Sequence, residues 1–289
     1  MESLRELYRI GKGPSSSHAM GPELASKLFS SEFPDAVEFR VRLFGSLSKT
    51  GKGHMTDDAV TEAFLPKKVI VTFCDTVEEN LPHPNTMELD ALDEVGNVCG
   101  HWRVFSVGGG KIIIEGKPLA TGAQVYPLTN FKSIKTHCAA RNMHLWQYVE
   151  EIEGPEIFRY LRAVWTQMKA SVAAGLEAEG ELRGGLHVQR KAKFLYGQHH
   201  MDESSETREN RLVCAYAFAV SEENAGGGTI VTAPTCGACG VLPSVLLYMQ
   251  EKRGFSDSDV VKALATAGLM GNIIKTNASI SGAECGCQA

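Results

Sequence analysis

The hydrophobic pattern changes its period once along this chain of 289 residues, and that change limits the folds open to it. Residues 36–47, AVEFRVRLFGSL, alternate apolar and polar side chains, which predicts a half-buried strand. Residues 155–180 instead repeat apolar side chains at helical spacing and end at a glycine, which predicts one long helix. The apolar positions of that helix are Ile157, Leu161, Val164, Trp165, Met168 and Val172.

The same two periods place the other expected elements on either side of residue 150. Strands are expected at residues 67–75 and within 85–115, where Gly96–Asn97 suits a hairpin turn. A short helix is expected between the first two strands, and further helices are expected at residues 208–221, 241–252 and 257–274. We therefore predict an α+β fold, in which residues 1–150 form a mixed α/β domain with a small antiparallel or mixed sheet and residues 151–289 form a mostly helical domain.

Composition and charge narrow the class of protein. A hydrophobic content of 43% and a charged content of 22% are ordinary for a soluble globular chain, and no apolar run reaches the length of a membrane span. The net charge of −5 and the lack of a dense Lys/Arg stripe argue against a nucleic-acid partner. The charged N-terminus MESLRELYRI is unlike a secretory signal, so we expect a cytoplasmic protein. In a reducing compartment, paired cysteines indicate metal or redox chemistry before disulfides.

A cluster of hydroxyl groups stands directly before an expected helix in KGPSSSHAMGP, residues 12–22. Apolar side chains recur every four residues from Met20 onward, and Pro22 suits a first helical turn because its missing N–H costs nothing there. The serines then lie where the unpaired backbone N–H groups of a helix point outward. Such a run either caps its own helix or binds an anion.

Two other kinds of segment leave alternatives open. SVGGGK, residues 106–111, lacks the full phosphate-loop spacing and stands between two strand-like runs, so a tight turn or a strand bulge is favoured over a nucleotide cradle. Cys236 and Cys239 have CxxC spacing, and Cys285 and Cys287 have CxC spacing. These thiols either form a zinc site or are small buried hydrophobic side chains.

Taken together, the motifs resemble those of the bacterial-type iron–sulfur L-serine dehydratases. The segments that resemble the β domain of that family are IGKGPSSSHAMGP, FGSLSKTGKGHMTDDAV, HPNTM and FSVGGGK. Those that resemble its α domain are GGLHVQRKA, ENAGGGTIVTAPTCGACGVLPSVL and NASISGAECGCQ. They follow one another in the family's order from near residue 5 to the last residue, as in the fused single-chain form with the β domain before the α domain.

This resemblance implies a function and a cofactor. The expected activity is that of an L-serine ammonia-lyase, which converts L-serine to pyruvate and ammonia. A four-iron–four-sulfur cluster held by three cysteines would act as the Lewis acid on the substrate hydroxyl, without pyridoxal phosphate. The first cluster ligand is expected to be Cys287, with Cys285 as the nearby competitor. The implied assembly is a homodimer that binds a small-molecule substrate, with no nucleic-acid or membrane partner.

The resemblance also assigns expected roles to site residues. His18 is expected to transfer or orient a proton, and Lys52 and His54 either face the same cleft or belong to a polar loop. The residues expected to bind substrate are Ser15, Ser16, Ser17, Asn277, Ser279 and Ser281.

The chain departs from the family's pattern at its last residue, Ala289. The family brings two more cluster cysteines about forty and about fifty residues after the first. We therefore expect the helical domain to be incomplete, the cluster not to assemble in the family's manner, and the apolar helix faces of residues 241–289 to be exposed. Two alternatives stand beside the lyase: a non-catalytic amino-acid-binding regulatory module, and a zinc-stabilised protein that uses the four paired cysteines.

Overall fold

The computed structural model describes residues 1–74, 81–118, 122, 124–198 and 201–278, and the chain forms two compact units. Lys12–Thr121 make up the sheet unit, and Met1–Gly11 together with Gly122–Ala289 make up the helical unit. This division differs from the expected one near residue 150. The reason is that the helices between residues 131 and 153 pack against the helices that follow them.

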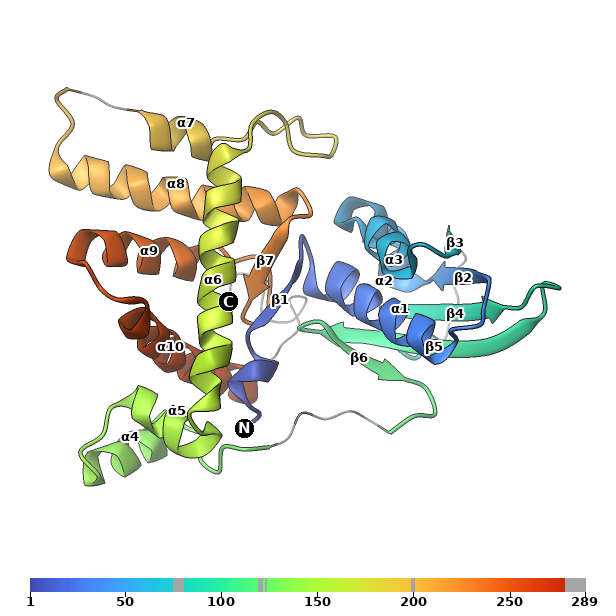
Figure 1. Ribbon diagram of the computed structural model, residues 1–289, viewed down its shortest axis with the longest axis horizontal. Helices are drawn as coiled ribbons and strands as arrows, with labels where there is room; N and C mark the ends of the chain where they lie inside the picture. The colour runs from blue at the N-terminus through green and yellow to red at the C-terminus, as the bar shows by residue number, and fades with distance from the viewer. Residues whose placement is uncertain (75–80, 119–121, 123, 199–200, 279–289) are drawn as a thin grey trace. The chain divides into compact units, whose positions relative to one another are not determined.

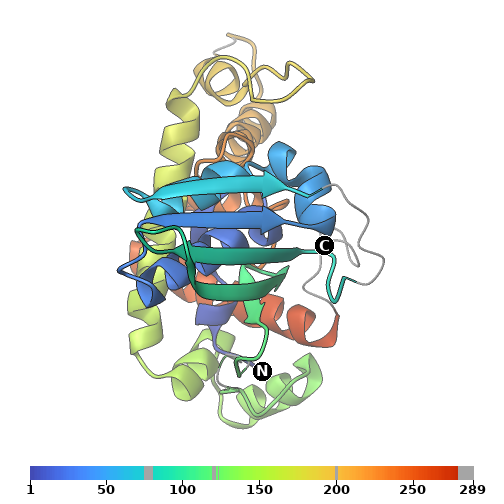
Figure 2. The same ribbon diagram turned by 90° about the vertical axis from the view of Figure 1, so that its right-hand side faces the viewer.

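The sheet unit contains a five-stranded mixed sheet in the order β3-β2-β4-β5-β6, seen face-on in Figure 2. Its strands are β2 (Glu38–Leu43), β3 (Lys68–Phe73), β4 (Thr86–Leu92), β5 (Val98–Gly108) and β6 (Lys111–Ile114). β2 and β3 are parallel, and the other neighbours are antiparallel. The helical segments of this unit are η2 (Ser16–Met20), α1 (Gly21–Glu32), α2 (Gly45–Gly51), η3 (Lys52–His54) and α3 (Thr56–Phe64).

The alternation in β2 explains how the sheet divides its side chains between two faces. Val41 is buried and is paired with Leu89 of β4, which in turn is paired with Trp102 of β5. On the other face, Arg42 reaches Glu88 at 2.9 Å. The predicted α+β class and the predicted mixed sheet are confirmed, as is the hairpin turn, where Gly96 has a φ of 87°.

The buried face of the sheet packs against α1 and α3. Phe29 of α1 meets Trp102 edge to face at 5.1 Å between ring centroids, and Phe64 of α3 stacks on Phe39 at 4.4 Å. Aromatic pairs of this kind combine a large buried area with a defined geometry. The sheet unit therefore has its own hydrophobic core, separate from that of the helical unit.

The helical unit is built around the long helix α6, shown in Figure 1 with its neighbours. Its elements are η1 (Leu4–Glu6), β1 (Arg9–Lys12), α4 (Phe131–Ala140), α5 (Leu145–Glu153), α6 (Glu156–Glu177), α7 (Ala192–Gly197), α8 (Ser205–Ala225), β7 (Thr229–Thr232), α9 (Val241–Arg253) and α10 (Asp257–Asn277). All six predicted apolar positions of α6 are buried, so the predicted long helix and its inward face are confirmed. The predicted helices at 208–221, 241–252 and 257–274 are confirmed as α8, α9 and α10.

The first residues of the chain belong to the helical unit, although the sequence placed them in the first domain. Tyr8 is buried and its hydroxyl donates a hydrogen bond to the carbonyl of Leu264 at 2.9 Å. Gly268 allows this approach, because a Cβ there would lie 2.7 Å from the Tyr8 ring. The Lys275 ammonium also reaches Glu2 at 2.6 Å. Contacts with α10 therefore decide where residues 1–11 lie.

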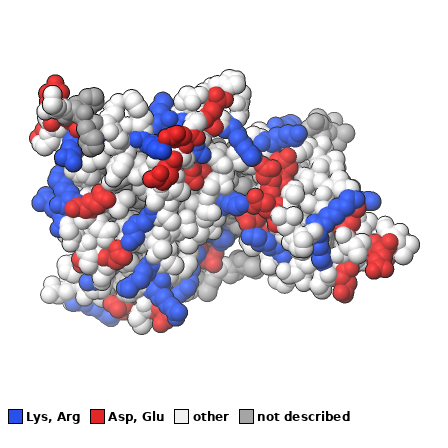
Figure 3. Space-filling model, turned by 45° about the horizontal axis from the view of Figure 1, so that its top comes forward, with Lys and Arg blue, Asp and Glu red and all other residues white. Residues whose placement is uncertain are grey.

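The visible surface carries no single dominant charge. Figure 3 shows basic and acidic side chains interspersed over the face that it presents, in agreement with many short ion pairs between Lys or Arg and Asp or Glu. Along the described part of the chain, no helix combines the length and the apolar character needed to cross a bilayer.

Candidate functional site

Four sequence motifs that lie far apart in the chain converge within the sheet unit. The Ser106 hydroxyl of β5 donates to the carbonyl of Ser17 at 2.7 Å, which joins the glycine-rich segment to the serine cluster. The Asn85 amide donates to the Ser106 carbonyl at 3.1 Å. The backbone N–H of Ser46 donates to the carbonyl of Pro84 at 2.7 Å. Backbone and side-chain bonds thus hold the motifs beside one another.

The serine cluster begins a helix, as predicted, but its first turn is not an α-helix. Ser16–Met20 form a π-helical turn that continues directly into α1, a departure often found at functional sites. Ser15 is the N-cap, and its hydroxyl accepts the backbone N–H of His18 at 3.1 Å. Gly21 lets this turn approach β5, because a Cβ there would lie 2.2 Å from the Ser106 hydroxyl. Ser16 is buried, whereas Ser15 and Ser17 are half-buried.

His18 lies between two hydroxyl groups. Its Nδ1 is 3.0 Å from the Ser17 hydroxyl, and its Nε2 is 3.1 Å from the Ser46 hydroxyl. Burial of the imidazole, together with the nearby charge of His54, lowers the pKa of His18 to about 4, against the opposing effect of a hydrogen bond with the Ser46 backbone. The ring is therefore neutral near pH 7 and able to accept a proton.

The two expected basic partners of His18 differ in their placement. The His54 ring lies 4.6 Å from the His18 ring, centroid to centroid, and its Nδ1 donates to the Thr50 carbonyl at 2.9 Å. Lys52 is exposed, with its ammonium 5.8 Å from the centre of the Phe73 ring. The structure thus brings His54 next to His18, and the catalytic roles of His54 and Lys52 stay predictions.

The buried state of His18 predicts a pH dependence of stability. Between the usual pKa of 6.5 and the folded value of about 4, the unfolded chain binds a proton that the fold does not. The contribution of His18 to the unfolding free energy is therefore complete above pH 6.5, and it is lost as the pH falls toward 4. Chemical denaturation across this range should give a steeper loss of unfolding free energy in the parent than in His18→Gln. Equal slopes would contradict the expected pKa.

The expected site residues of the helical unit are only partly described. The Asn277 amide donates to the carbonyls of Thr129 at 2.9 Å and of Ile273 at 2.8 Å, so its N–H groups bind main-chain carbonyls of α10 and of the segment before α4. Ser279, Ser281, Cys285 and Cys287 lie outside the described residues. Substrate contact by Asn277 and the two serines, and metal ligation by Cys287, therefore stay predictions.

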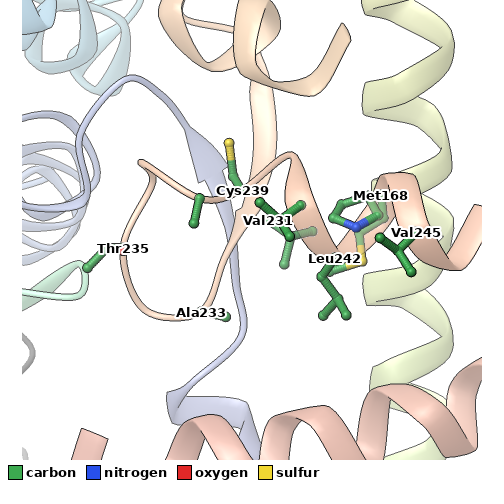
Figure 4. Close-up of a pocket in the computed structure, with 10 residues that line it drawn as sticks. Met168, Val231, Ala233, Thr235, Cys239, Leu242 and Val245 are labelled. Atoms are coloured by element: carbon green, nitrogen blue, oxygen red, sulfur yellow. The ribbon is translucent and has the colours of Figure 1, made fainter. Parts of the chain in front are cut away.

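An apolar cavity of about 340 Å³ lies in the helical unit where β7 leads into α9. Figure 4 shows Val231 from β7, Met168 from α6 and Cys239 from the intervening loop around it. Burial raises the pKa of the Cys239 thiol to about 12, and Cys236 is buried as well. Val241, which also lines the cavity, is 61% exposed.

The described cysteines do not assemble a metal site. In the part of the chain that the structure covers, no three or more His, Cys, Asp or Glu side chains gather closely enough to hold a metal ion. Cys236 and Cys239 fit the alternative of small buried side chains, while their expected partners at 285 and 287 are outside the described residues.

The glycine-rich segment forms the tight turn that was favoured over a nucleotide cradle. Gly108, Gly109 and Gly110 have φ values of 100°, 58° and 69°, which only glycine adopts readily, and they join β5 to β6. Ser46 and Ser106 were not among the expected site residues. Both lie in the quoted motifs, but no spacing rule connects either of them to His18.

Two families of known proteins match the chain, in the same order as the motifs. The family described as serine dehydratase beta chain matches residues 3–69, and the family described as serine dehydratase alpha chain matches residues 86–289. The gap between the two matches begins within β3 and ends directly before β4, inside the sheet unit.

Individual relatives match over the same extent. The L-serine dehydratase of Haemophilus influenzae is 35% identical over 341 residues, which include 100% of this chain and 75% of that protein. The L-serine dehydratase of Streptomyces coelicolor is 34% identical over 344 residues, with 99% of this chain and 74% of that protein. L-serine dehydratase 2 of Escherichia coli is 33% identical over 341 residues, with 100% of this chain and 75% of that protein.

Proposed function

The chain belongs to the serine dehydratase family, with the beta-chain part before the alpha-chain part, and we propose on this basis that it is an L-serine ammonia-lyase. The reaction removes the α-proton and the β-hydroxyl of L-serine as water. The resulting aminoacrylate tautomerises to an imine, and water hydrolyses the imine to pyruvate and ammonia. The single observation that carries this proposal is the agreement of both family matches, in order, with relatives named for this activity.

The cluster around His18 supports a role for the sheet unit in the proton transfers. A neutral imidazole can take up a proton and return it, and His18 is held neutral by its burial. The Ser17 hydroxyl touches its Nδ1, so a substrate proton can reach the ring either directly or through that hydroxyl. Ser15, Ser16 and Ser17 at the helix N-terminus are the proposed ligands of the substrate carboxylate.

The described residues do not fit the four-iron–four-sulfur cluster that the family resemblance implies. They contain no group of three or more metal-binding side chains, and burial keeps the Cys239 thiol protonated instead of as the thiolate that iron binds. Cys287, the proposed first ligand, lies outside the described part of the chain. We therefore assign no step of the reaction to the cluster.

The proposal also includes a reducing cytoplasm and a homodimer. No disulfide joins the described cysteines, which is compatible with a compartment that keeps thiols reduced. Size-exclusion chromatography with light scattering measures the assembly. A mass near twice 31.3 kDa supports the dimer, and a mass near 31.3 kDa at high concentration contradicts it.

Pyruvate formation tests the proposed activity directly. The protein is purified without oxygen, incubated with ferrous iron and sulfide, and supplied with L-serine or, as the matched control, D-serine. Pyruvate from L-serine alone supports the lyase. Binding of L-serine by calorimetry without any pyruvate overturns the lyase and favours the amino-acid-binding regulatory module, and the lack of both turnover and binding contradicts both functions.

A further inference from the structure

The turn from β2 into α2 places a hydroxyl group next to His18. Gly45 has a φ of 56°, and a Cβ at this position would lie 2.4 Å from the Pro84 carbonyl, so the turn requires glycine. Directly after it, Ser46 donates its N–H to Pro84 at 2.7 Å and accepts the Thr50 hydroxyl on its carbonyl at 2.9 Å. The turn at Gly45 and the main-chain bond to Pro84 therefore fix the position of Ser46 before any ligand binds, and the Thr50 hydroxyl only adds a bond within α2.

Hydroxyl groups contact the His18 ring at both of its nitrogens, and they form a chain of neighbouring oxygens on the Nδ1 side. The Ser15 hydroxyl accepts the backbone N–H of His18, and it lies 3.4 Å from the Ser17 hydroxyl, which is in turn 3.0 Å from Nδ1. If Ser15 donates onward to Ser17, the proton of Ser17 is directed to Nδ1. On the far side of the ring, the Ser46 hydroxyl is 3.1 Å from Nε2, and a hydrogen bond with the Ser46 backbone favours the protonated ring.

We propose that Ser46 is a positioning residue, which accepts a hydrogen bond from Nε2–H of His18 and thereby keeps Nδ1 as the proton acceptor that faces Ser17. In neutral imidazole only one nitrogen carries the proton, so an acceptor at Nε2 leaves the lone pair on Nδ1. Serine hydrolases use the same logic, in which a third group selects the tautomer of the base. Ser46 acts through His18 and does not itself need to touch the substrate.

The tautomer itself can be measured on the isolated protein. With ¹⁵N-labelled histidine, the ring nitrogen shifts of His18 at pH 7, assigned by their loss in His18→Gln, should show protonated Nε2 and unprotonated Nδ1. A parent protein with protonated Nδ1 overturns the proposal without any variant at Ser46. In Ser46→Ala we expect a mixture of the two tautomers, and in Ser46→Thr, which keeps the hydroxyl, we expect the parent pattern.

Thr50→Ala is the matched control for these variants. It removes a hydroxyl that bonds within α2 but leaves the Ser46 hydroxyl at the ring, so the tautomer should not change. If Thr50→Ala loses the parent tautomer pattern of His18 as fully as Ser46→Ala does, the effect of Ser46 comes from the structure of α2 and not from its hydroxyl. That result would overturn the proposal.

The role of Ser46 in turnover rests on the proposed function, and steady-state kinetics tests it separately from the tautomer measurement. If L-serine is the substrate, Ser46→Ala should lower kcat by about 10- to 100-fold with little change in KM, because the base is misoriented while the carboxylate contacts remain. An inactive parent with the expected tautomer would overturn the lyase and retain the positioning of His18. An active parent whose Ser46→Ala variant keeps full kcat would overturn the catalytic part of the inference and retain the lyase.

Discussion

His18→Ala is expected to lower the rate of pyruvate formation from L-serine by about 10²- to 10⁴-fold, the usual contribution of a positioned acid–base group. The imidazole is neutral near pH 7, it is buried, and hydroxyl groups hold both of its nitrogens. The alanine substitution removes the imidazole ring whose two nitrogens contact the Ser17 and Ser46 hydroxyls. Steady-state kinetics in oxygen-free buffer measures kcat and KM for the parent and the variant.

A second histidine in the same unit provides the control. His101 lies on the exposed face of the sheet, where its Nδ1 is 2.7 Å from Asp90. His101→Ala removes an imidazole of the same size outside the proposed site, so turnover should stay within about twofold of the parent. Circular dichroism confirms that both variants fold. Turnover of folded His18→Ala within a few-fold of the parent would remove His18 from the mechanism.

Lys275→Ala is expected to destabilise the helical unit by about 3 kcal/mol, because it removes the ammonium that binds the mostly buried Glu2 carboxylate. The Lys275 ammonium lies 2.6 Å from Glu2, and these side chains are only 8% and 14% exposed. The same ammonium donates to the Glu6 carbonyl at 3.2 Å, so one side chain ties α10 to the first residues of the chain. Denaturant unfolding measures the loss, and hydrogen exchange of residues 1–11 shows where it occurs.

An exposed ion pair in the same unit controls for the loss of a lysine. Lys193 lies 2.7 Å from Glu179, but both side chains are largely in water. Lys193→Ala should leave the unfolding midpoint unchanged, because exposed pairs gain little from their attraction. The double variant Lys275→Met with Glu2→Gln should lose less unfolding free energy than the sum of its single variants, since the two side chains contact each other directly. If the losses of unfolding free energy in the two single variants add up in the double variant, the two side chains do not form a coupled ion pair.

Local patterns in the sequence were sufficient for most elements. Period-two alternation predicts β2, and the helical repeat predicts α6 with its buried face, because both patterns arise from the side chains that one element turns toward its core. Gly96 and the three glycines at 108–110 likewise mark turns through a backbone conformation that other residues rarely adopt. The helices α4, α5 and α7 were not predicted, and the long strand expected at 36–47 ends at Leu43 because Gly45 turns the chain into α2.

The sequence by itself determined the order of the motifs, the family and the expected roles of His18 and the serines, since these depend on residue types at short spacing. Only the tertiary structure decided that residues 1–11 lie with the helical unit and that Ser46 and His54 reach the His18 ring. The physical reason is distance along the chain. A hydrogen bond between residues 28 positions apart, or an ion pair between residues 273 apart, depends on how whole elements pack, and no local period records it.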